Sequence, residues 1–173
     1  MNTRALNLRA SAVSGPVATH SRTIATNNMQ IRDDVLPAGI EGARPYGTED
    51  ASYRAAGSEA GIRKLVDDFY DAMDRLPQAA KIRAMHPEDL AASRDKLACF
   101  LCGWLGGPKL YAEKYGPIRI PQAHGRFAIG PQERDAWLSC MAEALKHQPY
   151  APAFKRHLLE QLHVPAERSR NRD

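Results

Sequence analysis

The chain has 173 residues, of which 43% are hydrophobic and 25% are charged, a balance typical of one globular domain. Its net charge of +4 comes from the two ends, because residues 29–164 hold 18 basic and 18 acidic side chains. A neutral centre offers no basic stripe for a nucleic acid. No run approaches the roughly 20 apolar residues that span a bilayer. We therefore expect neither a nucleic-acid nor a membrane partner.

Three cysteines, an odd number, do not make a disulfide framework and favour a reducing compartment, so we expect a cytoplasmic protein. Residues 1–28 are rich in Arg, Ser, Thr and Ala and contain no acid, which loosely resembles an organellar transit peptide. The alternatives are a tail without a targeting role, or translation that begins at Met29. Organellar localisation is therefore the second hypothesis.

Residues 1–44 are expected to form a disordered or loosely packed arm, because no periodicity appears and Gly and Pro interrupt the chain. This lack of periodicity continues to about Gly57. From Ser58 to Pro77 the apolar residues recur every three or four positions, which predicts an amphipathic helix. Its apolar face consists of Ile62, Leu65, Val66, Phe69, Tyr70 and Met73.

Three more amphipathic helices follow. One begins after Pro87 and ends at Gly106, the next begins after Pro131, and the last covers about residues 151–163. Residues 109–130 form a long connection interrupted by Gly and Pro, and such connections are usually functional or disordered. No segment alternates with the period of a strand, so the predicted fold is all-α. Residues 165–173 are expected to be a flexible tail.

The most specific pattern in the chain is QAHGRFAIGPQERDAWLSCM, from Gln122 to Met141. It resembles the signature of group II truncated haemoglobins, in which a histidine is followed by Phe and Ile and then by an Arg-Asp-Ala-Trp-Leu-x-Cys-Met block. Other pieces match in order: Pro45-Tyr46-Gly47, Gly61-Ile62-Arg63, Phe69-Tyr70, Phe100-Leu101 and Trp104-x-Gly106-Gly107-Pro108. The resemblance covers about residues 45–164, which we take as a truncated globin domain.

The resemblance implies a two-over-two helical sandwich that encloses haem b, with His124 as the proximal ligand of the iron. Neutral imidazole is a good iron ligand through its Nε2 atom. One departure concerns the backbone beside this histidine. The family has Ala-Pro between the histidine and the phenylalanine, whereas this chain has Gly125-Arg126.

On the side where a gas would bind, the resemblance identifies three side chains. Tyr70 and Trp137 match family residues that can donate hydrogen bonds to bound oxygen through a hydroxyl and an indole N–H. His86 falls in the turn before the second helix, where the family varies among Tyr, Phe and His. Ser93 stands where many globins have histidine, and a small residue there eases ligand entry. By periodicity alone, Tyr70 and Trp137 are equally explained as core residues.

Contacts to the haem are expected from the second helix, the long connection and the third helix. Charge and polarity make Lys109, Tyr111 and Arg126 candidates for the haem propionates. The expected haem contacts are Ser93, Leu97, Phe100, Leu101, Lys109, Tyr111, Arg126, Phe127 and Met141.

These residues together predict a haem globin that binds O2 and other small ligands, among them CO, NO, sulfide and peroxide. High oxygen affinity or reactive oxygen and nitrogen chemistry would follow, and an NO-dioxygenase-like or peroxidase-like activity would need a reductase. The chain would act as a monomer or a homodimer. The alternative is a cofactor-free helical interaction module, because four amphipathic helices can pack together without a ligand.

Cys99 and Cys102 form a C-x-x-C motif, which raises the hypothesis of a redox, metal or haem-attachment site. Covalent haem attachment needs a histidine at the next position, which is Gly103, and a zinc site needs a second close cysteine pair. On a helix both cysteines lie near the apolar face. They are therefore interpreted as small core residues, as is Cys140.

Overall fold

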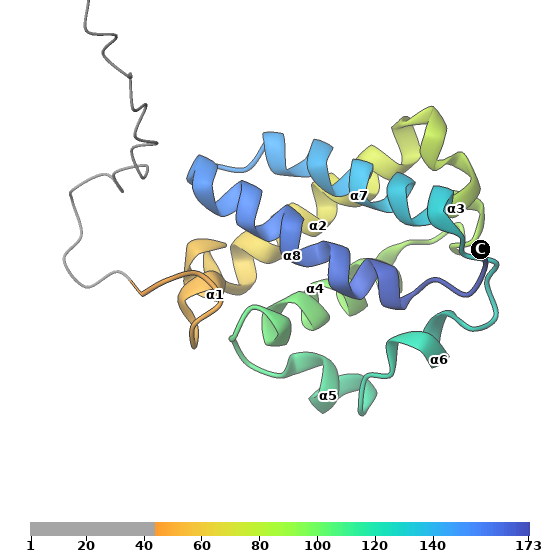
Figure 1. Cartoon of the computed structure of the whole chain (residues 1–173). Coiled ribbons are helices and arrows are strands. Elements are labelled where there is room, and N and C mark those ends of the chain that lie inside the picture. The colour runs from red at the N-terminus through yellow and green to blue at the C-terminus, as the bar shows by residue number, and fades with distance from the viewer. Residues whose placement is uncertain (1–43) are drawn as a thin grey trace, which may run out of the picture. The chain divides into compact units, whose positions relative to one another are not determined.

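The computed structural model describes residues 44–173 and shows a chain built from helices (Figure 1). The arm predicted for residues 1–44 lies outside the described residues, except for Arg44. No strand occurs in the described part of the chain, which confirms the all-α fold class, and none of its helices is long and apolar enough to cross a membrane. In chain order the elements are α1 (Ala51–Ala55), α2 (Ser58–Arg75), the 3-10 helix η1 (Pro77–Ala79), α3 (Ala80–Ala84), α4 (Ala91–Trp104), α5 (Leu110–Tyr115), α6 (Ile120–His124), α7 (Pro131–Lys146) and α8 (Pro152–Arg168).

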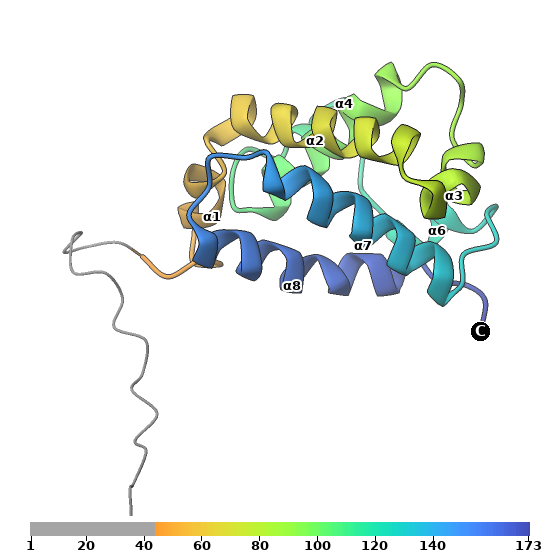
Figure 2. The same cartoon turned by 90° about the horizontal axis from the view of Figure 1, so that it is seen from above.

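Helix α2 lies at the centre of the fold. It contacts α4 and α7, and α7 in turn packs against α8, which runs in the opposite direction (Figure 2). The pair α2 and α4 therefore faces the pair α7 and α8. The connection from residue 109 to residue 130, which Gly and Pro interrupt in the sequence, contains the short helices α5 and α6. Elements of five or six residues are too short to display a hydrophobic period. Helix α5 contacts α4 and α6 contacts α8, so this connection bridges the two pairs.

The apolar stripe of α2 faces inward, as its periodicity predicts. The side chains of Ile62, Leu65 and Phe69 have no exposed surface. Burying a large apolar side chain contributes about 1.5–3 kcal/mol relative to leaving it in water. The long helices are therefore held together mainly by this shared core. The other helices contribute further fully buried side chains: Leu101, Cys102, Cys140, Met141, Phe154, Leu158 and Leu162.

All three cysteines are buried and form no disulfide. Burial raises the pKa of Cys102 and of Cys140 to about 11, and it also raises the pKa of Cys99. Thiolates, the reactive and metal-binding form, are therefore disfavoured at neutral pH. Among the described residues no group of three His, Cys, Asp or Glu side chains could hold a metal ion. The cysteines act as small core residues.

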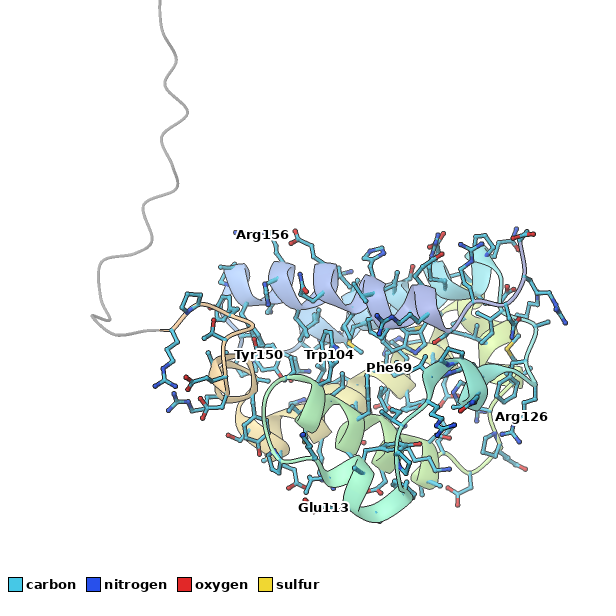
Figure 3. The ribbon with its side chains drawn as sticks, turned by 60° about the horizontal axis from the view of Figure 1, so that its bottom comes forward. Phe69, Trp104, Glu113, Arg126, Tyr150 and Arg156 are labelled. Atoms are coloured by element: carbon cyan, nitrogen blue, oxygen red, sulfur yellow. The ribbon has the colours of Figure 1, made fainter. Side chains whose placement is uncertain are left out.

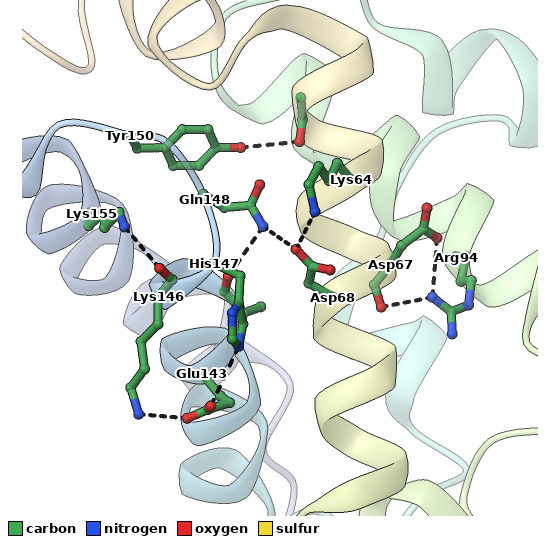
Figure 4. Close-up of polar contacts among 12 residues, drawn as sticks. Lys64, Asp67, Asp68, Arg94, Glu143, Lys146, His147, Gln148, Tyr150 and Lys155 are labelled. Carbon is green, nitrogen blue, oxygen red and sulfur yellow. Dashed lines mark hydrogen bonds and ion pairs between the residues drawn. The ribbon is translucent and has the colours of Figure 1, made fainter.

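Polar side chains tie α2 to its neighbours at the edges of the core (Figure 4). Arg94 on α4 donates to the backbone carbonyl of Asp67, at 2.8 Å, and to the carboxylate of Asp71, at 2.7 Å. On the other flank, Gln148, which follows α7, donates to the carboxylate of Asp68. Exposed ion pairs contribute little stability individually. Pairs that join two helices nevertheless restrict how those helices slide past one another.

The segment before residue 57 differs from the expectation of a loose chain. Ser52, on α1, is buried, and its hydroxyl accepts a hydrogen bond from the Gly47 N–H at 2.8 Å. The Tyr53 N–H donates to the carbonyl of Leu105 at 3.0 Å, so α1 is joined to the end of α4. A five-residue helix held by such long-range bonds leaves no periodic signal in the sequence.

The expected flexible tail from residue 165 is also corrected. Helix α8 continues to Arg168, and Pro165 and Ala166 in its last turn are buried. A proline removes one helical N–H donor, but its fixed φ is compatible with the helix. The Ser169 hydroxyl then donates to the Pro165 carbonyl at 3.0 Å. Residues beyond α8 are hydrogen-bonded to the segment between α6 and α7.

Gly61 allows a close backbone approach near the start of α2. A Cβ atom at this position would lie 2.0 Å from the carbonyl oxygen of Ala56. The carbonyl of Gly61 also accepts a hydrogen bond from the Tyr150 hydroxyl at 3.1 Å. The turn between α1 and α2 can therefore pack against α2 only if this position lacks a side chain.

We predict that Gly61→Ala destabilises the protein by about 1–3 kcal/mol, because the new methyl group collides with backbone that cannot move freely. Gly103, inside α4, is the matched control, since a Cβ there would meet its nearest atom at 3.4 Å. Gly103→Ala should be neutral or stabilising by up to about 1 kcal/mol, because alanine is the better helix former. Urea denaturation measures both. Equal effects of the two substitutions would contradict the assigned backbone contact.

Candidate haem site

A cavity of about 330 Å³ opens between the two helix pairs and is closed on one side by the connection that carries α5 and α6. Its size lies within the range of small-molecule and cofactor pockets. Most of its wall is apolar, and polar groups converge on it from α2, α4, α6 and α7. The apolar side chains that line it include Ile82, Met85, Leu97, Phe100, Ile118, Ile120, Phe127 and Ile129.

His124 is the last residue of α6 and lines this cavity. Its Nδ1 atom lies 2.8 Å from the carbonyl oxygen of Ile120, one helical turn earlier. A carbonyl can only accept, so this contact assigns the proton to Nδ1 and leaves the lone pair on Nε2. A hydrogen bond from one ring nitrogen to a backbone carbonyl is the usual way in which a metal-ligating histidine is oriented.

Tyr70, on α2, is 4% exposed and also lines the cavity. Burial raises the pKa of its phenol to about 12, so the hydroxyl keeps its proton at neutral pH and remains a donor. The ring meets that of His86 edge to face, with centroids 5.6 Å apart. The Arg94 guanidinium lies 5.5 Å from the centroid of the Tyr70 ring.

His86 follows α3 and is half-buried at the cavity wall. Its Nδ1 atom lies 2.8 Å from the carbonyl oxygen of Ile82, so its Nε2 is also free of this bond. Burial lowers the pKa of His86, which keeps the imidazole neutral at pH 7. His86 and His124 therefore line the same cavity, each with its Nδ1 bonded to a backbone carbonyl.

Trp137, on α7, completes the polar groups named by sequence. It is half-buried, and its ring centroid lies 5.1 Å from that of Phe69. Trp137 therefore packs against the core through Phe69 and also lines the cavity. Packing and hydrogen-bond donation are therefore compatible roles for this side chain.

The structure brings most of the sequence-predicted site residues to this cavity but not all of them. Leu101 and Met141 are fully buried in the core and do not line it. Lys109 is exposed at the start of α5 and does not line it either. Helical periodicity identifies a buried face but does not distinguish a core contact from a cavity wall. The predicted residues that do line the cavity are Tyr70, His86, Ser93, Leu97, Phe100, Tyr111, His124, Arg126, Phe127 and Trp137.

Several lining residues were missed by the sequence interpretation. Ile118, Ile120 and Ile129 are apolar residues in a connection rich in Gly and Pro. Large apolar side chains in such a connection could have indicated that it lines a cavity. The end of α8 contributes Pro165, Ala166 and Ser169, which local sequence could not reveal. Lys96, Glu133 and Arg134 add charged groups.

Three cationic side chains lie at the cavity. Arg134 is already paired with Asp135 and Glu167, at 2.8 and 2.6 Å. Arg126 lies near the edge of the molecule (Figure 3), with its guanidinium 4.7 Å from the centroid of the Phe127 ring. Within residues 44–173, neither Arg126 nor Lys96 makes an ion pair, so both can meet an external anion.

A second hollow, of about 510 Å³, lies on the surface beside α2 and α3, and His86 contacts both spaces. Its other lining residues include the charged side chains Asp74, Arg75, Arg83 and Glu88. Such a lining does not suit an apolar ligand. The smaller, more apolar cavity is therefore the candidate site.

The residues of this cavity fit the haem that the sequence resemblance implies. An apolar macrocycle requires apolar walls, its propionates require cations, and its iron requires an imidazole nitrogen. The cavity provides the aliphatic and aromatic walls described above. Lys96 and Arg126 are cations that meet no carboxylate within residues 44–173, and His124 provides an Nε2 lone pair.

Comparison with known proteins gives the same answer. Residues 51–170 match the family described as bacterial-like globin. The chain is 34% identical, over 117 residues, to the group 2 truncated hemoglobin YjbI of Bacillus subtilis (strain 168), a match that covers 68% of this chain and 86% of that protein.

Solved structures agree with the sequence relatives. The group II 2-on-2 hemoglobin of Agrobacterium tumefaciens superposes with a TM-score of 0.68 and 34% identity, over 78% of this chain and all of that one. A truncated haemoglobin from Bacillus subtilis, described as oxygen-avid, has a TM-score of 0.63 and 32% identity, over 69% of this chain and 98% of that one. The predicted two-over-two fold and the resemblance are confirmed. The chain therefore belongs to the bacterial-like globin family, and within it to the group II truncated haemoglobins.

Proposed function

We propose that this globin holds haem b through His124 and binds O2, and other diatomic gases, in the part of the cavity lined by Tyr70. The observation that carries the proposal is the state of the His124 ring. Its Nδ1 is engaged by the Ile120 carbonyl, and the ring lines an apolar cavity that also contains a buried phenol.

Haem supplies the ferrous iron at which a diatomic gas binds. The protein supplies the environment of that gas. The Tyr70 hydroxyl and the Trp137 indole N–H donate hydrogen bonds, and both keep their protons at neutral pH. Bound O2 carries partial negative charge, so donors in a dry cavity stabilise it more than they stabilise an uncharged gas. Leu97, Phe100 and other apolar side chains exclude water.

These donors favour tight oxygen binding. We therefore propose a role in holding oxygen or directing its reactivity rather than in transporting it. A related haemoglobin described as oxygen-avid supports this assignment. Burial lowers the pKa of His86, which favours the neutral ring, so its Nε2 can accept a hydrogen bond within the same cavity. Oxidative chemistry on NO or peroxide would draw electrons from a separate reductase. Three buried, unpaired cysteines favour the reducing cytoplasm.

We predict that the purified protein shows a Soret band and that His124→Ala lowers its haem content strongly, because the iron loses its protein ligand. Added imidazole should restore the spectrum by filling the vacated position. Visible spectroscopy at equal protein concentration measures both effects. An unchanged spectrum in His124→Ala would assign the ligand to another residue, with His86 the first to test. No Soret band in the parent after haem reconstitution would favour a cofactor-free helical module.

The distal donors are tested by conservative substitutions. Tyr70→Phe and Trp137→Phe each remove one donor and keep an aromatic ring. A hydrogen bond to a group with ionic character contributes about 1.5–3 kcal/mol, so each variant should release O2 roughly ten- to a hundredfold faster. Stopped-flow displacement by CO measures the rate. The double variant should be faster still, without strict additivity. Parental rates in all three variants would exclude these donors from the gas site.

The haem propionates are expected to pair with cations at the cavity rather than with Lys109. Lys96→Ala should speed haem transfer to apomyoglobin by about two- to fivefold, the size expected from an exposed ion pair worth up to ~1 kcal/mol. Lys109→Ala is the matched control, since Lys109 is exposed and outside the cavity. If Lys109→Ala loses haem as fast as Lys96→Ala, the propionates lie elsewhere.

A further inference from the structure

Helix α6 carries the proposed iron ligand, yet it has little internal support. It has five residues and buries none of them. A helix this short is unstable by itself, because nucleation costs more than a single turn returns. The carbonyl of His124 accepts the N–H of Phe127 at 3.0 Å, which closes only a local turn. Whatever holds the end of α6 in place must come from elsewhere in the chain.

That support comes from the residues that follow α8. The side-chain amide of Asn171 donates to the carbonyl of Phe127, at 2.7 Å, and to the carbonyl of His124, at 3.3 Å. Its side-chain oxygen accepts the N–H of Ile129 at 3.1 Å. The N–H groups of Asn171 and Arg172 both donate to the Ile129 carbonyl, at 2.9 and 3.0 Å. We call residues 169–172 the C-terminal strap.

The strap is itself fixed to the long helices. The Ser169 N–H donates to the Ala166 carbonyl at 3.1 Å, which extends the end of α8. The Arg170 guanidinium bonds the Glu167 carboxylate at 2.6 Å, and that carboxylate also pairs with Arg134 of α7. Figures 1 and 2 both show the end of the chain beside the segment that joins α6 to α7. The strap therefore connects the α7 and α8 pair to the histidine segment.

We propose that Asn171 is a positioning residue for His124, and that through it the C-terminal strap sets the angle at which the imidazole meets the haem. This proposal rests on the proposed role of His124 as iron ligand. Two contacts define the histidine: the Ile120 carbonyl fixes its ring, and the Asn171 amide fixes its backbone carbonyl. Asparagine suits this position because its amide both donates and accepts.

Substitutions at Asn171 and at Arg172 separate the effect of the Asn171 side chain from that of the rest of the strap. Asn171→Asp keeps the acceptor for the Ile129 N–H but removes both donors, and it places a carboxylate beside the carbonyls of His124 and Phe127. Arg172 is the matched control, because among the described residues its guanidinium bonds only the Asn171 carbonyl, at 3.2 Å. Its backbone bond to Ile129 survives substitution.

The test uses the full-length haem protein and its Asn171→Ala, Asn171→Asp and Arg172→Ala variants. Resonance Raman spectra of the ferrous, ligand-free form report the iron–histidine stretching band. We expect both Asn171 variants to shift or broaden this band and to lose haem to apomyoglobin up to about tenfold faster, as one or two lost hydrogen bonds predict. Arg172→Ala should match the parent in both measurements.

Hydrogen exchange of the haem-free protein supplies a second measurement that does not depend on the iron. Amides in residues 124–129 should exchange faster in Asn171→Ala than in the parent, with α2 unchanged. If Asn171→Ala lowers the melting temperature but leaves the iron–histidine band and this exchange as in the parent, the strap has only a general stabilising role and the proposal fails. If the parent itself shows no iron–histidine band, or keeps it in His124→Ala, the proposed function fails instead.

Discussion

The buried face of helix α2 contacts both the hydrophobic core and the cavity. The candidate site depends on the boundary between the two. Phe69 is fully buried in the core, and the next residue, Tyr70, lines the cavity. Phe69 contacts the rings of both Tyr70 and Trp137, at centroid distances of 5.0 and 5.1 Å. Core packing therefore locks the two proposed donors in position. A side chain held by a close-packed core keeps its orientation without further hydrogen bonds.

No residue of α5 or α6 is fully buried, so polar contacts add to the packing of the half-buried side chains between α4 and α7. Asp95 on α4 accepts from Lys114 at 2.6 Å, from Tyr115, and from Arg63 of α2 at 3.2 Å. The Lys114 ammonium and the Tyr115 hydroxyl hold the pKa of Asp95 well below its usual range, so it stays ionised. The Asp95 carboxylate thus connects α5 to α2 and α4. Asn171 connects the segment that contains His124 to the pair α7 and α8.

His86 and His124 use the same local device. Each follows or ends a five-residue helix, and each directs Nδ1 to the carbonyl four residues earlier, at 2.8 Å. The bond leaves Nε2 available in both rings. Hydrogen bonding alone therefore does not decide which of the two imidazoles would hold an iron ion. The residues that follow His124 resemble those after the proximal histidine of the family, and this resemblance is the reason for proposing His124 as the ligand.

The four long helices could be predicted from the sequence, because their apolar stripes repeat with the helical period. The family resemblance, carried by several separate motifs, made His124, Tyr70 and Trp137 the candidate site residues. Of the 23 residues that line the cavity, the sequence interpretation named ten. The folded structure shows that Leu101 and Met141 face the core, because helical periodicity indicates that a residue is buried but not which surface it contacts. It alone placed the strap on the histidine segment, since a hydrogen bond between residues 47 positions apart leaves no local pattern to read.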